Sequence, residues 1–105
     1  MTAHAPVNVG RLIVSRPEIR SGRPCLAGTA MTVRAVAVRH MQGMTAEDIL
    51  EQFPHLDIAR IYAALAYYYA NRAEIDADIE ADRRLGEELA ARYPRGWPPR
   101  EADQP

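Results

Sequence analysis

The side chains of this chain that could do chemistry are its charges, and these are segregated along the sequence. All thirteen basic residues are arginines, and six of them lie between positions 11 and 44 with the single acid Glu18, a net charge of +5. From position 45 onward thirteen acids accompany seven arginines, a net charge of −6, and seven of these acids lie between Glu74 and Glu88. This segregation predicts two different partners, an anionic one for the first part and a basic one for the second.

The arginines are the candidates for contacts with nucleic acid, because phosphate contacts supply a large share of the affinity of DNA-binding proteins. The predicted DNA-binding residues are Arg11, Arg16, Arg20, Arg23, Arg34, Arg39 and Arg60. An alternative stays open at this point. The same arginines could only keep the surface hydrated, or pair with the acidic part of a second copy.

The sequence offers no arrangement of residues suited to catalysis or to metal binding. Cys25 is the only cysteine, and there is no Ser-His-Asp order, phosphate-binding loop or catalytic pair of carboxylates. We expect Cys25 to be a small buried apolar group and His40 to be a boundary histidine rather than a metal ligand. The sequence therefore predicts a protein that is not an enzyme and that uses no cofactor or metal.

Two short strands and a first helix are expected at the start of the chain. The apolar run 12–14 and the segment around Cys25, each bounded by turn residues, predict a hairpin-like arm. Thr32 is a suitable N-cap for a helix that Gly43 would end. The expected apolar positions of this helix are Val33, Val36, Ala37, His40 and Met41.

Two further helix starts follow. Thr45 and Asp48 resemble a capping box for a second helix that ends before Pro54, and Asp57 is the N-cap expected for a third. The outward positions expected on the third helix are Asp57, Ala59, Arg60, Ala63, Ala64 and Tyr67. With one arginine and one acid among them, this helix predicts a weak surface for reading DNA.

Apolar residues, with Arg72 in one place, recur in alternating steps of three and four from the third helix onward. The positions are Ile58, Ile61, Leu65, Tyr68, Arg72, Ile75 and Ile79. This repeat predicts either one helix of about 26 residues or two helices broken near Asn71, and we favour the continuous helix.

The second half of the chain also carries apolar residues suited to a protein partner. Consecutive helical residues point about 100° apart, so the side chains of Tyr67, Tyr68 and Tyr69 cannot all be buried. Tyrosine is enriched in protein interfaces. The predicted partner-binding residues are Tyr67, Tyr69, Ile75, Ile79, Leu85, Leu89, Tyr93 and Trp97.

These elements predict a mainly α fold. We expect a tri-helical, homeodomain-like (winged) helix-turn-helix core with a short N-terminal β-arm and a long C-terminal helix. The expected organisation is a flexible N-terminus (1–10), the arm with the helix-turn-helix domain (11–71), an acidic amphipathic partner-binding helix (72–92) and a proline-rich, disordered tail (93–105). Without an apolar run of about 20 residues or a signal-peptide pattern, we expect a cytoplasmic protein with no membrane contact. The small core favours a homodimer.

The segment 19–70 resembles the domain of unknown function 433 family, and the pattern extends upstream to Pro17. The residues that carry the resemblance are Pro17, Ile19, Gly22, Pro24, Gly28, Thr29, Gly43, Thr45, Glu47, Asp48, Ile49, Leu50, Pro54, Leu56, Ala63, Ala64, Leu65 and Tyr68. The chain departs from the pattern where Ser21 replaces a glycine, Ala30 an arginine and Met31 a branched apolar residue. The lost arginine bears most on DNA binding.

The resemblance implies a homeodomain-like helix-turn-helix preceded by short strands, and a likeness to VapB-type antitoxins paired with a PIN-like ribonuclease toxin. We therefore expect a dimeric antitoxin that binds operator DNA through its arginines. It would neutralise the toxin through residues beyond about Asn71, by a segment that folds as it binds. The alternative expectation is an interaction or dimerisation adaptor domain that does not bind DNA.

Overall fold

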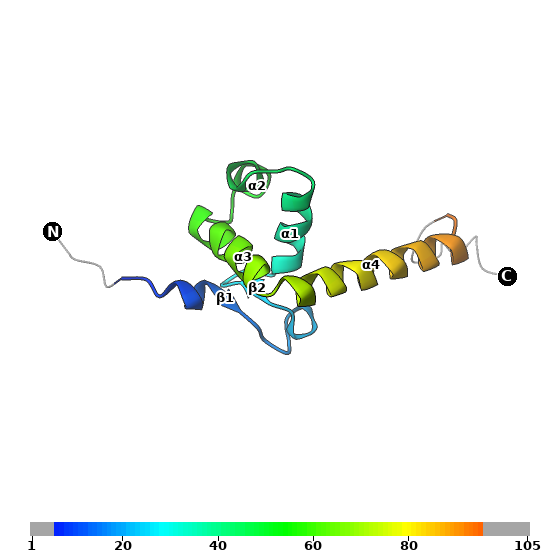
Figure 1. The fold of residues 1–105 in the computed structure, drawn as a ribbon, viewed down its shortest axis with the longest axis horizontal. Coiled ribbons are helices and arrows are strands. Elements are labelled where there is room, and N and C mark those ends of the chain that lie inside the picture. Colours follow the sequence, from blue (N-terminus) through cyan, green and yellow to red (C-terminus); the bar gives the residue numbers. More distant parts are fainter. Residues whose placement is uncertain (1–5, 96–105) are drawn as a thin grey trace. The chain divides into compact units, whose positions relative to one another are not determined.

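The computed structural model describes residues 6–95 and is mainly helical, with a small two-stranded sheet before four α-helices (Figure 1). In chain order the elements are η1 (Val9–Leu12), β1 (Ile13–Val14), η2 (Arg20–Gly22), β2 (Cys25–Leu26), α1 (Val33–Met41), α2 (Ala46–Gln52), α3 (Ile58–Ala70) and α4 (Arg72–Arg92), where η marks a 3₁₀ turn. The mainly α class predicted from the sequence is confirmed.

The two strands form an antiparallel pair in which Ile13 lies opposite Leu26 and Val14 lies opposite Cys25. The predicted strand began one residue too early, because Leu12 ends η1 instead. Cys25 is 2% exposed and Leu26 is fully buried, so β2 is part of the hydrophobic core. The buried cysteine expected from the sequence is confirmed.

The three predicted N-caps are all present, and each closes a helix start with a local hydrogen bond. The backbone N–H of Ala35 donates to Thr32 Oγ1 over 3.0 Å at the start of α1. Thr45 and Asp48 form the reciprocal capping box of α2. The Asp57 carboxylate accepts from the backbone N–H of Arg60 at the start of α3.

Helix α3 is the central element of the core, because it packs against α1, α2 and both strands. The most deeply buried side chains are Leu26, Val33, Val36, Ala37, Ile49, Ile61, Ala64 and Tyr68. The outward placement predicted for Ala63 and Ala64 is wrong, since they are 6% and 0% exposed. Neighbours on several sides of α3 bury a wider arc than a single apolar stripe predicts. Met41, expected on the apolar side of α1, is 59% exposed.

The continuous helix favoured from the periodicity is also wrong, because α3 ends at Ala70 and α4 begins at Arg72. Asn71 lies between them with φ −128° and ψ 39°, outside helical geometry. Its side-chain Nδ2 donates to the Tyr67 carbonyl over 3.0 Å. Asparagine side chains offer the backbone such local alternatives to a continuing helix, which is the physical reason for the break.

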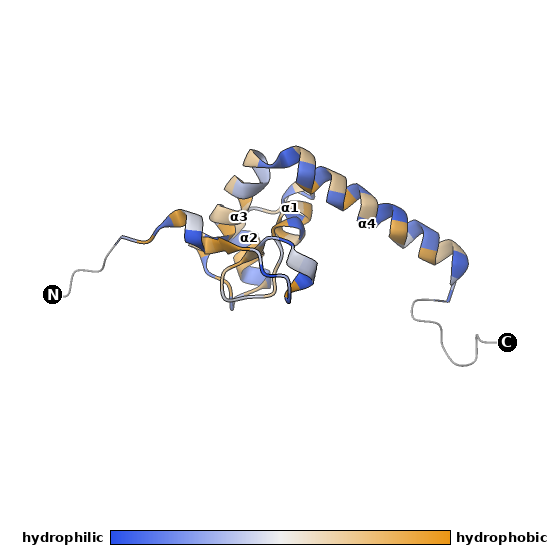
Figure 2. Ribbon diagram, turned by 90° about the horizontal axis from the view of Figure 1, so that it is seen from below, coloured by the Kyte–Doolittle hydropathy of each residue, from blue (hydrophilic) through white to orange (hydrophobic). Residues whose placement is uncertain are grey.

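The chain divides into two compact units, one up to Ile75 and the other from Asp76 onward. The first unit contains the hairpin, α1 to α3 and the first residues of α4, and Ile75 is only 3% exposed within it. Along the second unit, hydrophilic and hydrophobic residues alternate on α4 (Figure 2). No helix within residues 6–95 is long and apolar enough to span a membrane.

Candidate nucleic-acid interface

Arg20 is positioned by an unusual stretch of backbone. Arg20, Ser21 and Gly22 have φ values of 50°, 57° and 80°, all in the left-handed region. For the two residues with a side chain this conformation costs about 1 kcal/mol or more each. The turn places Arg20 so that its Nε donates to the Ala30 carbonyl over 3.1 Å. Its side chain is thereby anchored against the loop that precedes α1.

Arg20 lines a surface pocket of about 360 Å³ together with residues from α1 and from the turn after α2. The lining residues are Arg20, Ala30, Met31, Thr32, Arg34, Ala35, Phe53 and His55. Two of them are arginines and none is an acid. The rings of Phe53 and His55 meet edge to face, with their centroids 6.3 Å apart.

Arg39 adjoins this pocket through two of its lining residues. Its Nη1 donates to the Ala35 carbonyl over 3.0 Å, and its guanidinium carbon lies 4.7 Å from the centroid of the Phe53 ring. The Nε of Arg39 donates to Gln52 Oε1 at the end of α2. We call Arg20, Arg34, Arg39 and His55 the basic cluster.

The basic cluster has the chemistry of a phosphate-binding surface. Its three guanidinium groups remain charged at any physiological pH and present several N–H donors in a planar fork. They come from η2 and from both ends of α1, so tertiary structure brings them together around Phe53. Like charges held together on one surface attract a polyanion more strongly than the same charges dispersed.

Arg60 was predicted to contact DNA, but the structure uses it to hold the fold together. Its Nε donates to the Ala27 carbonyl over 3.0 Å, which joins α3 to the end of the hairpin. It also forms an ion pair with Asp57. The hydrogen bond from the backbone N–H of Arg60, helped by its guanidinium, holds the pKa of Asp57 below its ordinary value.

The other predicted DNA-binding arginines lie outside the basic cluster. Arg11 is exposed in η1, Arg16 is exposed after β1 and lines a different pocket, and Arg23 follows η2 and is half-buried. The structure therefore gathers Arg20, Arg34 and Arg39 and distributes the remaining four. Phe53 and His55 were not predicted as site residues, although both flank the turn residue Pro54.

The exposed face of α3 carries no basic residue. Its exposed positions are Ala59, Tyr62, Ala66, Tyr69 and Ala70. Tyr62 was not predicted as a site residue, although its seven-residue spacing from Tyr69 puts both on one helix face. Its hydroxyl donates to Glu47 Oε1 over 3.0 Å, and this carboxylate raises the pKa of Tyr62.

Three of the predicted partner-binding residues belong to the first unit. Tyr69 is 55% exposed, and its hydroxyl is hydrogen-bonded to His40 Nε2. Tyr67 is half-buried, while Tyr68 is 2% exposed, so the expectation that the three tyrosines would differ in burial is confirmed. Ile75 is buried in the core of this unit and does not offer a docking surface.

The remaining partner-binding candidates lie on and after α4. Leu85 is 51% exposed, and Ile79, Leu89 and Tyr93 are half-buried. At 100° per residue Ile79, Leu85 and Leu89 fall within an arc of about 120°, which makes an apolar stripe along the helix that Asp82 interrupts. Trp97 lies outside the described residues.

The charges of α4 are divided along its length. Between positions 74 and 82 there are five acids and no base. Farther along, Arg83 pairs with Glu80 and Glu87, and Arg84 pairs with Glu80. These partners lower the pKa of Glu80 to about 2. The net negative charge of α4 is therefore concentrated in its first half.

Within residues 6–95 no group of three or more His, Cys, Asp or Glu side chains is placed to hold a metal ion.

A family model described as "Protein of unknown function (DUF433)" matches residues 13–68, which is more than half of the chain. The chain belongs to the DUF433 family. The matched segment runs from β1 into α3, so it includes the whole basic cluster and excludes α4. The resemblance noted from the sequence is confirmed for the family itself.

A solved structure of a DUF433 member protein from Anabaena variabilis is similar to this chain. The similarity has a TM-score of 0.62 and 26% sequence identity, and it covers 67% of this chain and 69% of the other. A comparison with curated proteins found no match.

Proposed function

We propose that this DUF433 protein is the antitoxin of a type II toxin-antitoxin pair. In this proposal a homodimer binds operator DNA through the basic cluster and represses its own transcription. The acidic helix α4, with the chain that follows it, binds and neutralises a PIN-like ribonuclease toxin. The observation that carries the proposal is the separation of charge, with three arginines gathered on the first unit and an acidic amphipathic helix in the second.

We further propose that α2 and α3 act as a helix-turn-helix. Support comes from their packing against each other and from the short turn, residues 53–57, that joins them. Helix α3 would then occupy the place of a recognition helix. Since its exposed face offers alanine and tyrosine side chains beside Glu47, we assign the phosphate contacts to the basic cluster instead.

The DNA-binding half is tested by titrating the DNA upstream of the protein's own gene at several salt concentrations. Each phosphate contact contributes about 0.9 to the slope of log K against log salt. The variant with Arg20→Gln, Arg34→Gln and Arg39→Gln should therefore lose about 2.7 from this slope for each subunit bound, or about 5.4 for the dimer. The control variant, Arg83→Gln with Arg84→Gln and Arg92→Gln, removes the same charge from α4 and should keep the wild-type slope.

Two outcomes would contradict this half of the proposal. One is that the wild-type protein shows no affinity for the DNA even at about 50 mM salt, where phosphate contacts are strongest. The other is that the cluster variant and the α4 control have equal slopes.

The toxin-binding half is tested by co-expression with the protein encoded in the adjacent reading frame. Leu85 and Leu89 lie on the apolar stripe of α4, so Leu85→Asp with Leu89→Asp should abolish complex formation and the rescue of growth. Ala77→Asp with Ala91→Asp is the control, because these exposed alanines lie on the opposite side of the helix from that stripe. Equal rescue by both variants would remove α4 from the proposed interface.

The second candidate function is a dimerisation or adaptor domain without nucleic acid. It is favoured by one observation, the uncharged exposed face of α3 with Tyr62 and Tyr69 at 52% and 55% exposure. A protein that dimerises through Tyr62 and Tyr69 and does not bind DNA would fit this alternative. Light scattering of a Tyr62→Asp, Tyr69→Asp variant measures whether the dimer is lost. Together with the DNA titration, this measurement distinguishes the two functions.

A further inference from the structure

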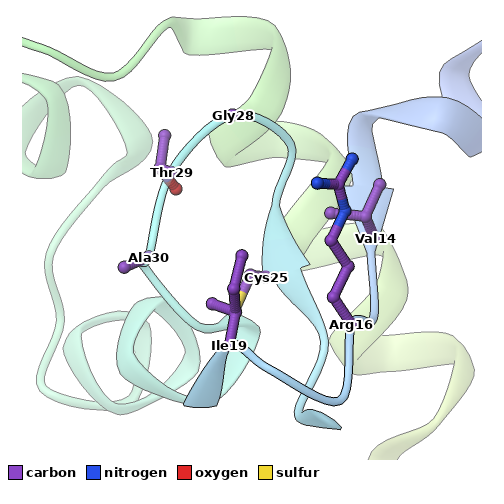
Figure 3. Close-up of a pocket in the computed structure, with 7 residues that line it drawn as sticks. All are labelled: Val14, Arg16, Ile19, Cys25, Gly28, Thr29 and Ala30. Atoms are coloured by element: carbon purple, nitrogen blue, oxygen red, sulfur yellow. The ribbon is translucent and has the colours of Figure 1, made fainter.

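A second pocket, of about 400 Å³, lies between the end of β1 and the loop that follows β2. Figure 3 shows Arg16 and Val14 on one side, the loop with Thr29 and Ala30 on the other, and Ile19 with Cys25 between them. Its volume falls within the range of pockets that bind small molecules. No acid lines it.

The walls of this pocket are almost entirely apolar. Burial raises the pKa of the Cys25 thiol, so this wall residue stays neutral at physiological pH. The Thr29 hydroxyl is already occupied, because it donates to the Leu26 carbonyl over 2.9 Å and accepts from the backbone N–H of Met31. Val14, Ile19 and Ala30 add only hydrocarbon surface.

Arg16 is the one charged residue at this pocket. It is exposed, and within residues 6–95 it has no ion-pair partner. Glu18 is the only acid between positions 11 and 44, and it does not line the pocket. Because Arg16 extends beside Val14, a group bound against the apolar walls would have this guanidinium at its edge (Figure 3).

We infer that this pocket binds a small carboxylic acid with an apolar body, such as a short fatty acid. The apolar walls would remove the hydrocarbon body from water. The planar guanidinium of Arg16 would donate two N–H hydrogen bonds to the carboxylate, in the paired geometry that arginine and carboxylate groups share. An amine would be repelled by Arg16, and a sugar would leave its hydroxyl groups without partners on these walls. This site is separate from the basic cluster and does not depend on DNA binding.

The test is a titration of the full-length, DNA-free protein with hexanoate. Calorimetry measures the binding, and amide chemical shifts show which residues are affected. We expect saturable binding with shifts at Cys25 and Ala30 and none at Gly43, which lies at the far end of α1. Hexanol and hexylamine should bind at least about tenfold more weakly, because neither can accept the paired, charge-assisted hydrogen bonds of Arg16.

The matched variants are Arg16→Gln and Arg11→Gln, which remove the same charge from two exposed arginines. Arg16→Gln should weaken hexanoate binding about tenfold, and Arg11→Gln should leave it unchanged. Thermal unfolding of both variants checks that neither alters the fold. The inference is overturned if hexanoate does not saturate the protein at millimolar concentrations, if hexanol binds as tightly, or if the two variants bind equally. None of these results bears on the DNA titration.

Discussion

At the scale of single residues, the most informative feature is the left-handed turn at Arg20, Ser21 and Gly22. Glycine adopts positive φ without a steric penalty, whereas Arg20 and Ser21 must be held there by their surroundings. The hydrogen bond from Arg20 to the Ala30 carbonyl is one such restraint. Strain of this kind often accompanies a site, and here it sets the direction of a basic cluster side chain.

The strain at Ser21 can be measured by substitution. Ser21→Val should lower the free energy of unfolding by about 1 kcal/mol or more, because a β-branched side chain is especially unfavourable at positive φ. Ser21→Gly should leave stability within about 0.5 kcal/mol of wild type, since relief of strain and added chain entropy oppose each other. Urea denaturation gives both values.

Ser15→Val is the control for that experiment, because Ser15 is exposed and has no positive φ. It should change stability by no more than about 0.5 kcal/mol. Equal losses for the two valine variants would show that the turn at Ser21 is not strained.

At the scale of elements, the first three α-helices each begin at an N-cap residue. The side chain of that residue accepts a hydrogen bond from a backbone N–H in the first turn of the same helix. Such caps operate over three residues, so they form whatever the rest of the fold does. The caps at Thr32, Thr45 and Asp57 fix where α1, α2 and α3 start. The Asp57 cap is reinforced by Arg60, which also joins α3 to the hairpin.

The Asp57 cap should make stability depend on pH. Its pKa is lowered in the folded protein, so the stabilisation is complete above the ordinary carboxyl pKa and is lost as pH falls through and below it. Asp57→Asn keeps a hydrogen-bond acceptor but cannot titrate. The stability advantage of wild type over Asp57→Asn should therefore shrink from pH 7 to pH 3, as measured by urea denaturation.

The exposed Glu51 provides the control for this pH series. Glu51→Gln removes a carboxylate from α2 that caps no helix, and its difference from wild type should change less over the same range. An advantage over Asp57→Asn that stays constant with pH would contradict the assigned role of the Asp57 carboxylate.

At the scale of the whole molecule, the chain consists of two compact units whose boundary falls inside α4, after Ile75. The first unit has its own hydrophobic core. It contains the basic cluster and the apolar pocket beside Arg16. The second carries the acidic and apolar surface proposed for a protein partner.

Truncation tests this division. A chain ending at Ala77 keeps Ile75 and should unfold cooperatively, with a melting temperature close to that of the full chain. A chain ending at Ala70 loses Ile75, a fully packed side chain whose removal costs about 2 kcal/mol or more. Its melting temperature, followed by circular dichroism, should be clearly lower. Equal stability of the two truncated chains would place the boundary before α4.

The sequence by itself determined the features that depend on near neighbours along the chain. The caps at Thr32, Thr45 and Asp57, the left-handed glycine after α1 at Gly43 and the short strand at Cys25 were all predictable. Each rests on hydrogen bonds or backbone preferences that span only a few residues. The segregation of charge is likewise a property of the sequence alone.

Only the tertiary structure decided which side chains meet. It buried Ala63 and Ala64, because α3 has neighbours on several sides. It gathered Arg20 and Arg34 from different elements and committed Arg60 to the hairpin. These outcomes depend on contacts between residues far apart in the sequence, and periodicity and local spacing carry no information about such contacts.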